Sequence, residues 1–161
     1  MAKINESLEN LTSNILLNND LYKIPVNILK IAKANDITVF TADLEKKILG
    51  AIRYDKQNKK YTILLNEKQS YEQQRFTLAH ELGHFFLHKQ ILESEELHVD
   101  IMYKIEDEQE AEVDYFAGAL LMNKLLLEKM YEKNQSIREL AEMFEVSVSV
   151  MTIRLDTIGL I

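Results

Sequence analysis

Two histidines and a glutamate stand close together in the run His80-Glu81-Leu82-Gly83-His84. Residues four apart lie on the same face of an α-helix, so His80 and His84 can direct their imidazoles at a single metal ion. Glu81 projects to the side of that pair, where its carboxylate can take a proton from a water molecule that the metal activates. The pattern is typical of zinc metalloproteases and predicts His80 and His84 as metal ligands and Glu81 as the catalytic base.

The segment around these residues predicts a buried helix, because apolar side chains fall on almost every face of it. They are Phe76, Leu78, Ala79, Leu82, Phe85, Phe86 and Leu87. Buried imidazoles need polar partners, and a shared metal ion supplies one to both histidines. The alternative is a chance pair of core histidines that hydrogen-bond to other groups. We favour the metal site.

The composition bounds the size of the protein and the kind of metal site. A chain of 161 residues with 47% hydrophobic residues accommodates one well-buried core and is short for two. The absence of cysteine excludes thiolate ligands and disulfides, so a zinc ion must use histidine and carboxylate. The longest apolar stretch, 115–122, is shorter than the roughly 18 residues of a membrane span, and no signal-peptide pattern opens the chain. We therefore expect a soluble, cytoplasmic protein.

The net charge of −7 originates in one segment of the sequence. Residues 93–114 hold ten acidic residues and a single base, Lys104, a net charge of −9, so the rest of the chain carries +2. Such a block is usually a solvated connection, and the alternative is that it borders a cleft and favours basic substrates. Either way, it is unsuited to contact the phosphates of nucleic acids.

The spacing of the remaining apolar residues predicts an α+β fold. Helical periodicity indicates helices over 3–17, from a first turn at Pro25 to Ala34, over 71–89 and over 106–129, with two short helices after Gln135. Short runs rich in β-branched and aromatic residues occur at 37–40, 48–54 and 61–65, separated by polar turns. They indicate a small antiparallel sheet of about three strands, packed on a mainly helical core.

Two histidines leave a catalytic zinc one protein ligand short. Position 90, ten residues after His80, is glutamine, so the acidic helix that follows is the best source of a third ligand. At about 100° per residue, Glu110 falls within the apolar arc of that helix, whereas Glu108 and Glu112 point toward solvent. A carboxylate on a buried face needs a compensating charge, which zinc supplies. Glu110 is therefore the predicted third ligand.

For three other polar residues the sequence leaves alternative roles open. Asp114, one turn after Glu110, can accept a hydrogen bond from the outer N–H of a ligand histidine or simply face solvent. His88 stacks one turn beyond His84, but its position suits a helix end better than a fourth ligand. His98 stands alone in the acidic segment, which favours a surface role over the alternative of polarising the substrate. The residue that stabilises the oxyanion is open among Tyr103, Tyr115 and His98.

With these residues in place, the chain resembles the ImmA/IrrE family of zinc metallo-endopeptidases over most of its length. The resemblance rests mainly on residues 75–88 and 110–122. The family pattern places a ligand glutamate four residues before an Asn or Asp that precedes x-Phe-Ala, and this alignment also selects Glu110. Two departures, Val113 in place of Ala and Asn123 in place of Pro, leave the ligands unaffected.

The resemblance implies a zincin-like metallopeptidase core over residues 1–130 and a C-terminal extension, 131–161, packed on it in a single compact unit. Residues 136–155 of the extension look like a helix-turn-helix. From residue 131 to residue 161 there are three bases against five acids, too few cations to bind DNA phosphates tightly. Packing on the core or docking a partner is therefore favoured over direct DNA binding.

Members of this family include antirepressors of prophages and other mobile elements, which inactivate a helix-turn-helix repressor by cleaving it. The resemblance therefore implies a zinc endopeptidase that cuts a specific partner repressor. The composition and the charge argue against a membrane partner and against direct nucleic acid binding. The alternative is a zinc-stabilised module that neutralises a transcription factor by binding it without cleavage.

Overall fold

A computed structural model describes residues 4–102 and 107–161 of the chain. The helices in these ranges are α1 (Glu6–Asn18), α2 (Ile28–Ala34), α3 (Tyr71–Leu87), α4 (Lys89–Glu95), α5 (Glu108–Leu121), α6 (Lys124–Tyr131), α7 (Ile137–Phe144) and α8 (Val148–Thr157). The strands are β1 (Ile37–Ala42), β2 (Ile48–Asp55), β3 (Lys60–Asn66) and β4 (Leu97–Ile101). The predicted α+β fold class is confirmed.

Short polar side chains set where most of the helices begin. In all of the described helices except α4, the N-cap side chain accepts a hydrogen bond from an amide of the first turn; these caps are Asn5, Asn27, Ser70, Asp107, Asn123, Ser136 and Ser147. Each such cap contributes about 1 kcal/mol to helix stability. The cap at Asn27 also corrects one prediction, because α2 begins at Ile28 and Pro25 precedes the helix instead of opening its first turn.

The sheet is mixed and has four strands in the order β1-β3-β2-β4. β2 pairs antiparallel with β3 and β4, whereas β1 pairs parallel with β3. The expected antiparallel sheet of about three strands therefore needs two corrections. β4 adds an edge strand, and β3 inserts between β1 and β2. Because the chain reverses direction twice between β1 and β3, these two neighbours run the same way.

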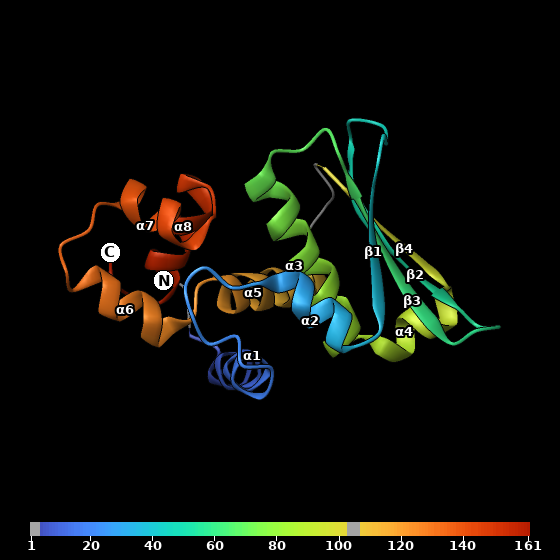
Figure 1. Ribbon diagram of the computed structural model, residues 1–161, viewed down its shortest axis with the longest axis horizontal. Helices are drawn as coiled ribbons and strands as arrows, with labels where there is room; N and C mark the ends of the chain where they lie inside the picture. The colour runs from blue at the N-terminus through green and yellow to red at the C-terminus, as the bar shows by residue number, and fades with distance from the viewer. Residues whose placement is uncertain (1–3, 103–106) are drawn as a thin grey trace.

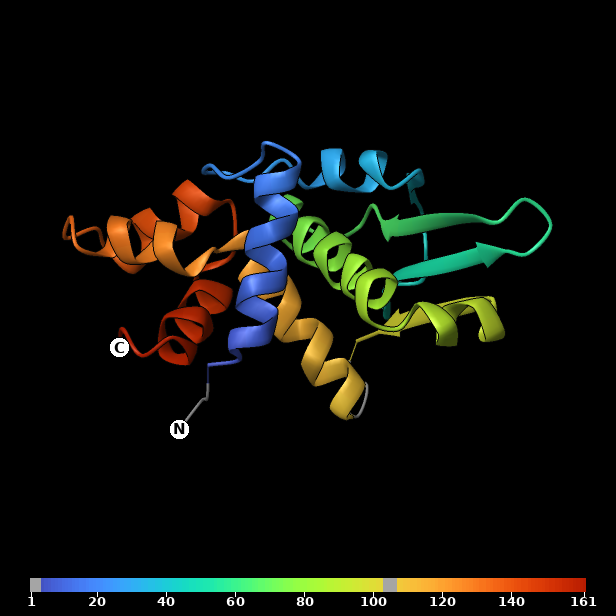
Figure 2. The ribbon, with the colours of Figure 1, turned by 90° about the horizontal axis from the view of Figure 1, so that it is seen from below.

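Helix α3 joins the sheet to the helical part of the molecule. It packs on β2 and β3 and also on α5. Figures 1 and 2 show the sheet at one end of the molecule and the C-terminal helices at the other, with α1, α3 and α5 between them. Buried side chains from the sheet, α3 and α5 form one core; they include Ile52, Ile63, Leu82, Phe116 and Leu120.

Gly83 allows α3 and α5 to approach closely. A β-carbon at this position would lie 3.1 Å from side-chain atoms of both Phe116 and Val113 on α5. That spacing is tighter than the 4.0–4.5 Å at which apolar side chains are normally in contact. The missing side chain at Gly83 thus brings α5 directly beside the middle of α3.

The helix predicted over 106–129 is divided in the structure, where α5 ends at Leu121 and α6 starts at Lys124. Residue 106 lies outside the described residues. The side chain of Asn123 accepts hydrogen bonds from the amides of Leu125 and Leu126 at 3.1 and 3.2 Å. The prediction of one continuous helix is wrong because the apolar spacing continues across a break that this local cap creates.

Helices α7 and α8 are joined by the three-residue turn 145–147 and pack on each other. At this turn, the buried Arg75 of α3 donates hydrogen bonds to the carbonyl oxygens of Phe144 and Glu145, at 3.4 and 3.1 Å. The guanidinium therefore ties the end of α7 to the helix that carries the histidine motif.

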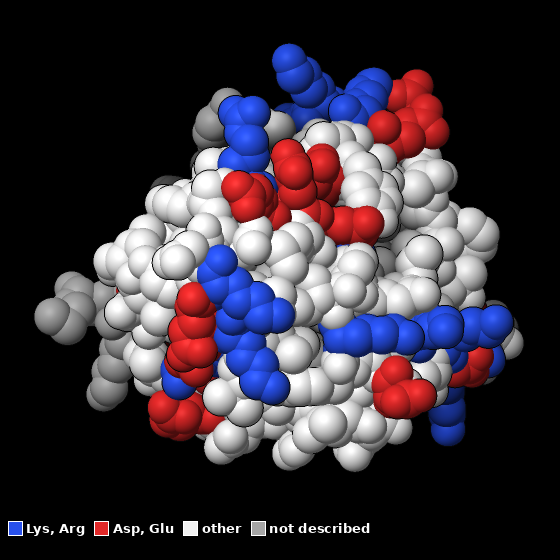
Figure 3. Space-filling view, turned by 60° about the vertical axis from the view of Figure 1, so that its left-hand side comes forward, with Lys and Arg blue, Asp and Glu red and all other residues white. Residues whose placement is uncertain are grey.

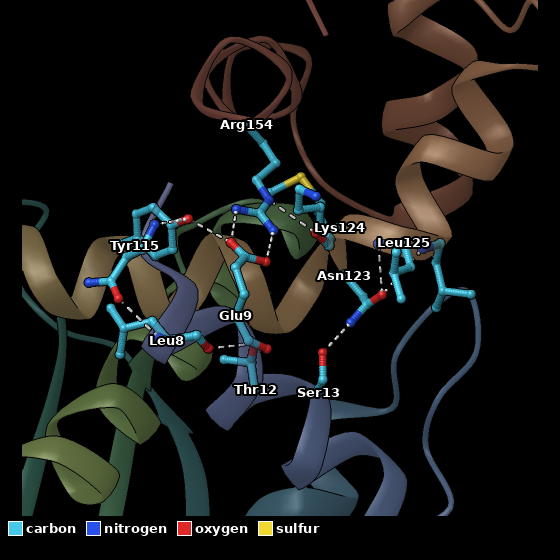
Figure 4. Close-up of polar contacts among 12 residues, drawn as sticks. Leu8, Glu9, Thr12, Ser13, Tyr115, Asn123, Lys124, Leu125 and Arg154 are labelled. Carbon is cyan, nitrogen blue, oxygen red and sulfur yellow. Dashed lines mark hydrogen bonds and ion pairs between the residues drawn. The ribbon is translucent and has the colours of Figure 1, made fainter. Parts of the chain in front are cut away.

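A second buried arginine fixes α8 to the N-terminal helix (Figure 4). Arg154 of α8 donates two hydrogen bonds to the carboxylate of Glu9 on α1, at 2.7 and 2.8 Å, and a third to the carbonyl oxygen of Met122. The side chains of Arg154 and Glu9 are only 3% and 8% exposed. Because both charges are buried, each depends on the other for compensation.

Replacing Arg154 with leucine should lower the free energy of unfolding by about 3–5 kcal/mol, because Glu9 would stay buried without its partner. Urea unfolding followed by circular dichroism measures the change. The matched control is Arg138→Leu, at an exposed arginine of α7, which should shift the free energy by no more than about 0.5 kcal/mol. Adding Glu9→Leu to Arg154→Leu should recover much of the loss, and a double variant no more stable than Arg154→Leu would contradict this account.

Candidate active site

The histidine motif lies in the second half of α3, within the core. His80, Glu81 and His84 are all buried. Residues of α5 and β4 lie against them. The site is therefore assembled from α3, the acidic helix α5 and the edge strand β4.

The ring nitrogens of both histidines meet the carboxylate of Glu110, which α5 contributes. His80 Nε2 lies 3.0 Å from Glu110 Oε2, and His84 Nε2 lies 3.4 Å from Glu110 Oε1. One ligand atom from each of the three residues lies within 4.8 Å of the other two. A single ion with bonds of about 2.0–2.2 Å can bridge such a set. Glu110 is buried while Glu108 and Glu112 are exposed, as the helical periodicity predicts.

The charges around His80 suit a cation. Carboxylates of Glu110, Asp114 and Asp100 lie 3.0, 2.7 and 4.0 Å from its ring nitrogens, and Glu81 follows it in the chain. Burial disfavours a charged imidazole, but Asp114 and Glu110 outweigh that effect and raise the pKa of His80 well above its ordinary value. A site that attracts positive charge this strongly fits a divalent metal ion.

The other two predicted ligands have the protonation states that metal binding needs. Burial lowers the pKa of His84 to about 4, so its ring is neutral at pH 7 and has a lone pair for a metal. Burial acts to raise the pKa of Glu110, but the nearby rings of His80, His84 and His98, and His80 above all, reverse this and hold the pKa far below its ordinary value. Glu110 is therefore a carboxylate.

Asp114 lies against His80 and not merely in solvent. Its Oδ1 accepts a hydrogen bond from His80 Nδ1 at 2.7 Å. Because Nδ1 keeps its proton for Asp114, Nε2, which faces Glu110, is the ring nitrogen that can exchange its proton for a metal ion. Of the two alternatives that the sequence leaves for Asp114, the structure shows the contact with a histidine that the first one requires.

His98 lies at the site, so the expectation of a surface role is wrong. Its Nε2 is 3.2 Å from Glu110 Oε1, and its ring centroid is 4.2 Å from that of His84. Asp100, two residues further along β4, is also buried and faces the same cluster. Among the described residues, Asp100 forms a second group of three candidate ligands with His80 and Glu81.

β4 escapes detection from sequence because its polarity is inverted. Alternate residues of a strand point to opposite faces, and here the polar His98 and Asp100 turn inward while Leu97 and Ile101 are 53% and 39% exposed. The segment therefore does not place apolar side chains on the buried face, as a strand that covers a hydrophobic core does. The alternation of apolar and polar residues in Leu97-His98-Val99-Asp100-Ile101 is nevertheless that of a strand, and this pattern could have revealed β4.

The three candidates for the oxyanion contact differ in their placement. The hydroxyl of Tyr115 donates a hydrogen bond of 2.6 Å to Glu9 and accepts one from the amide of Asn5, so it belongs to the ion-pair network of α1 and α8 (Figure 4). Tyr103 lies outside the described residues. His98 is thus the candidate that the described part of the chain brings to the site. His88 ends α3, as predicted.

None of the helices in the described ranges combines the length and the hydropathy that spanning a membrane requires.

Comparison with known proteins agrees with the geometry. The sequence matches the family of the IrrE N-terminal-like domain over residues 32–156. It is 31% identical to Metallopeptidase ImmA of Bacillus subtilis over 135 residues, which cover 83% of this chain and 77% of that protein. The structure of a Mycobacterium tuberculosis transcriptional regulator aligns with a TM-score of 0.69 at 17% identity, over 95% of this chain and 47% of that one. This chain therefore spans about half the length of the regulator, and that likeness concerns the fold alone.

The family match extends over most of the chain, and so does the identity with ImmA. The chain belongs to the ImmA/IrrE family of metallopeptidases.

Proposed function

We propose that this chain is a zinc-dependent endopeptidase that cleaves a partner transcriptional repressor at a specific site. The observation that carries the proposal is the convergence of His80, His84 and Glu110, with Glu81 buried beside them. Membership of a metallopeptidase family supports the same reaction class. Three protein ligands are the number that a catalytic zinc uses, since its fourth position stays open for water or substrate.

In this mechanism His80, His84 and Glu110 hold the zinc ion, and Asp114 fixes the orientation of His80. When bound, zinc makes water more acidic and polarises the scissile carbonyl. Glu81 accepts a proton from the attacking water while the water oxygen bonds to the carbonyl carbon. Glu81 then delivers that proton to the departing nitrogen as the C–N bond breaks. The full burial of Glu81 limits competition from bulk water for this proton.

A protein substrate suits the C-terminal helices better than DNA does. Arg154 of α8 is directed to Glu9 in the interior, where its charge cannot reach a phosphate. Figure 3, which brings the left-hand side of Figure 1 forward, shows Lys and Arg side chains interspersed with Asp and Glu and separated by neutral surface. Because DNA affinity depends on several cations acting together on phosphates, this distribution supports a protein partner.

The choice of a repressor as substrate rests on the resemblance to antirepressors of prophages and mobile elements. Such a substrate is found on chromosomal DNA, so we also propose a cytoplasmic location.

The direct test is to incubate the zinc-loaded chain with the helix-turn-helix repressor encoded beside its gene and to search for new termini by mass spectrometry. One pair of new termini is expected. An intact repressor in a stoichiometric complex would instead support the second candidate function, neutralisation of the repressor by binding. The small size of the chain and the α7–α8 pair motivate that candidate.

Replacing Glu81 with glutamine should slow cleavage about 10²–10⁴-fold, the usual contribution of a positioned general acid–base group. Bound zinc should stay at the wild-type level, because Glu81 is not a ligand. Cleavage rates from gel densitometry and zinc content from mass spectrometry measure the two effects. Glu72→Gln, in the first turn of the same helix, is the control with the same change in charge. Cleavage by Glu81→Gln at the wild-type rate would exclude this mechanism.

Replacing Glu110 with glutamine should weaken zinc binding by more than the roughly 10–100-fold that loss of an outer-sphere partner causes, because it removes a ligand. Competition with a chromophoric chelator measures the affinity. The control is Glu108→Gln, at an exposed position two residues earlier on α5, which should bind zinc like the wild type. Equal affinities for the two variants would remove Glu110 from the ligand set.

A further inference from the structure

Each of the two ligand histidines has a hydrogen bond on the ring nitrogen that faces away from Glu110. His80 uses Nδ1 to contact Asp114 directly. His84 Nδ1 instead lies 3.3 Å from Nδ1 of His88, whose Nε2 lies 3.0 Å from Glu112 Oε1. We infer that His88 and Glu112 are positioning residues, which together orient His84 for the metal as Asp114 orients His80.

The order of the contacts determines which nitrogens carry protons. The Glu112 carboxylate can only accept a hydrogen bond, so His88 donates from Nε2. With Nε2 as the donor to Glu112, Nδ1 of His88 is the nitrogen placed to accept the N–H of His84 Nδ1. His84 in this tautomer presents its lone pair at Nε2, the buried atom that lies beside Glu110. This is the tautomer that metal ligation through Nε2 requires.

The arrangement of the two helices explains why the second contact needs an intermediate residue. Glu110, Glu112 and Asp114 all belong to α5, but Glu112 lies on its exposed side, with a side chain 46% exposed. His88, one turn beyond His84 at the end of α3, reaches from the buried ring toward that surface. Its own side chain is 11% exposed, and its ring centroid lies 5.5 Å from that of His84. His88 therefore links the exposed carboxylate of Glu112 to the buried ring of His84 through two successive hydrogen bonds.

This inference rests on the zinc site of the proposed function, but its first test does not depend on cleavage. Long-range ¹H–¹⁵N spectra of the zinc-loaded protein report which imidazole nitrogens are protonated. We expect the proton of His84 on Nδ1 and that of His88 on Nε2. A proton on His88 Nδ1, or on His84 Nε2, would overturn the inference. If the tautomers are as expected but the zinc-loaded wild type cleaves no repressor, the proposed function fails and the assignment of the protons stands.

The second test compares zinc affinities of variants by chelator competition. His88→Phe, which keeps a ring but neither donor nor acceptor, should bind zinc about 10–100-fold more weakly than the wild type. His88→Gln keeps an acceptor and a donor and should remain close to the wild type. A glutamine variant as weak as His88→Phe, or a phenylalanine variant as tight as the wild type, would overturn the inference.

Glu112→Ala tests the outer member of the pair at an exposed position where folding is not at risk. It should weaken zinc binding in the same direction as His88→Phe, because His88 would lose the acceptor that fixes its tautomer. Glu108→Ala, one turn earlier on the same helix, removes an equal charge without touching a histidine and serves as the matched control. Identical zinc affinities for Glu112→Ala and Glu108→Ala would contradict a positioning role.

Discussion

The close packing of α3 on α5 is the constraint on which the site depends. Gly83 leaves room for Val113 and Phe116, so the two helices approach without an intervening side chain. Each large apolar side chain buried in such an interface contributes roughly 1.5–3 kcal/mol, which offsets the cost of burying charged groups beside it. The polar cluster of His80, His84 and Glu110 is therefore held by an apolar contact. The opposite charges within it supply the remaining compensation.

Helix α5 organises both histidines from its first turns. Asp107 caps the helix by accepting a hydrogen bond of 2.9 Å from the amide of Glu110, which fixes the backbone at the predicted third ligand. Asp114 contacts His80 directly, and Glu112 reaches His84 through His88. One short acidic segment thus provides the predicted third ligand, Glu110, and the carboxylates that contact His80 directly and His84 through His88. In the sequence, this acidic segment is typical of a solvated connection. In the structure, several of its carboxylates lie beside histidine rings and attract positive charge to them.

The sequence predicts the site best where a single helical periodicity governs the environment. The burial of Glu110 is predicted because α5 has one buried face, and the convergence of His80 and His84 because their spacing matches the helical repeat. His98 is missed because β4 turns its polar side chains inward, so burial no longer follows polarity. The break between α5 and α6 is missed because the cap at Asn123 interrupts an apolar pattern that continues past it. The parallel pairing of β1 with β3 depends on contacts that no local pattern encodes.

The central claim is that His80, His84 and Glu110 hold a catalytic metal ion beside Glu81. Anomalous diffraction at the zinc absorption edge, from crystals of the zinc-loaded protein, tests it most directly. The account predicts one peak bonded to Nε2 of both histidines and to the Glu110 carboxylate, with no bond to Glu81 and one coordination position not taken by protein. A peak bonded to Glu81, or an ion enclosed by four protein ligands through His98 or Asp100, would contradict it.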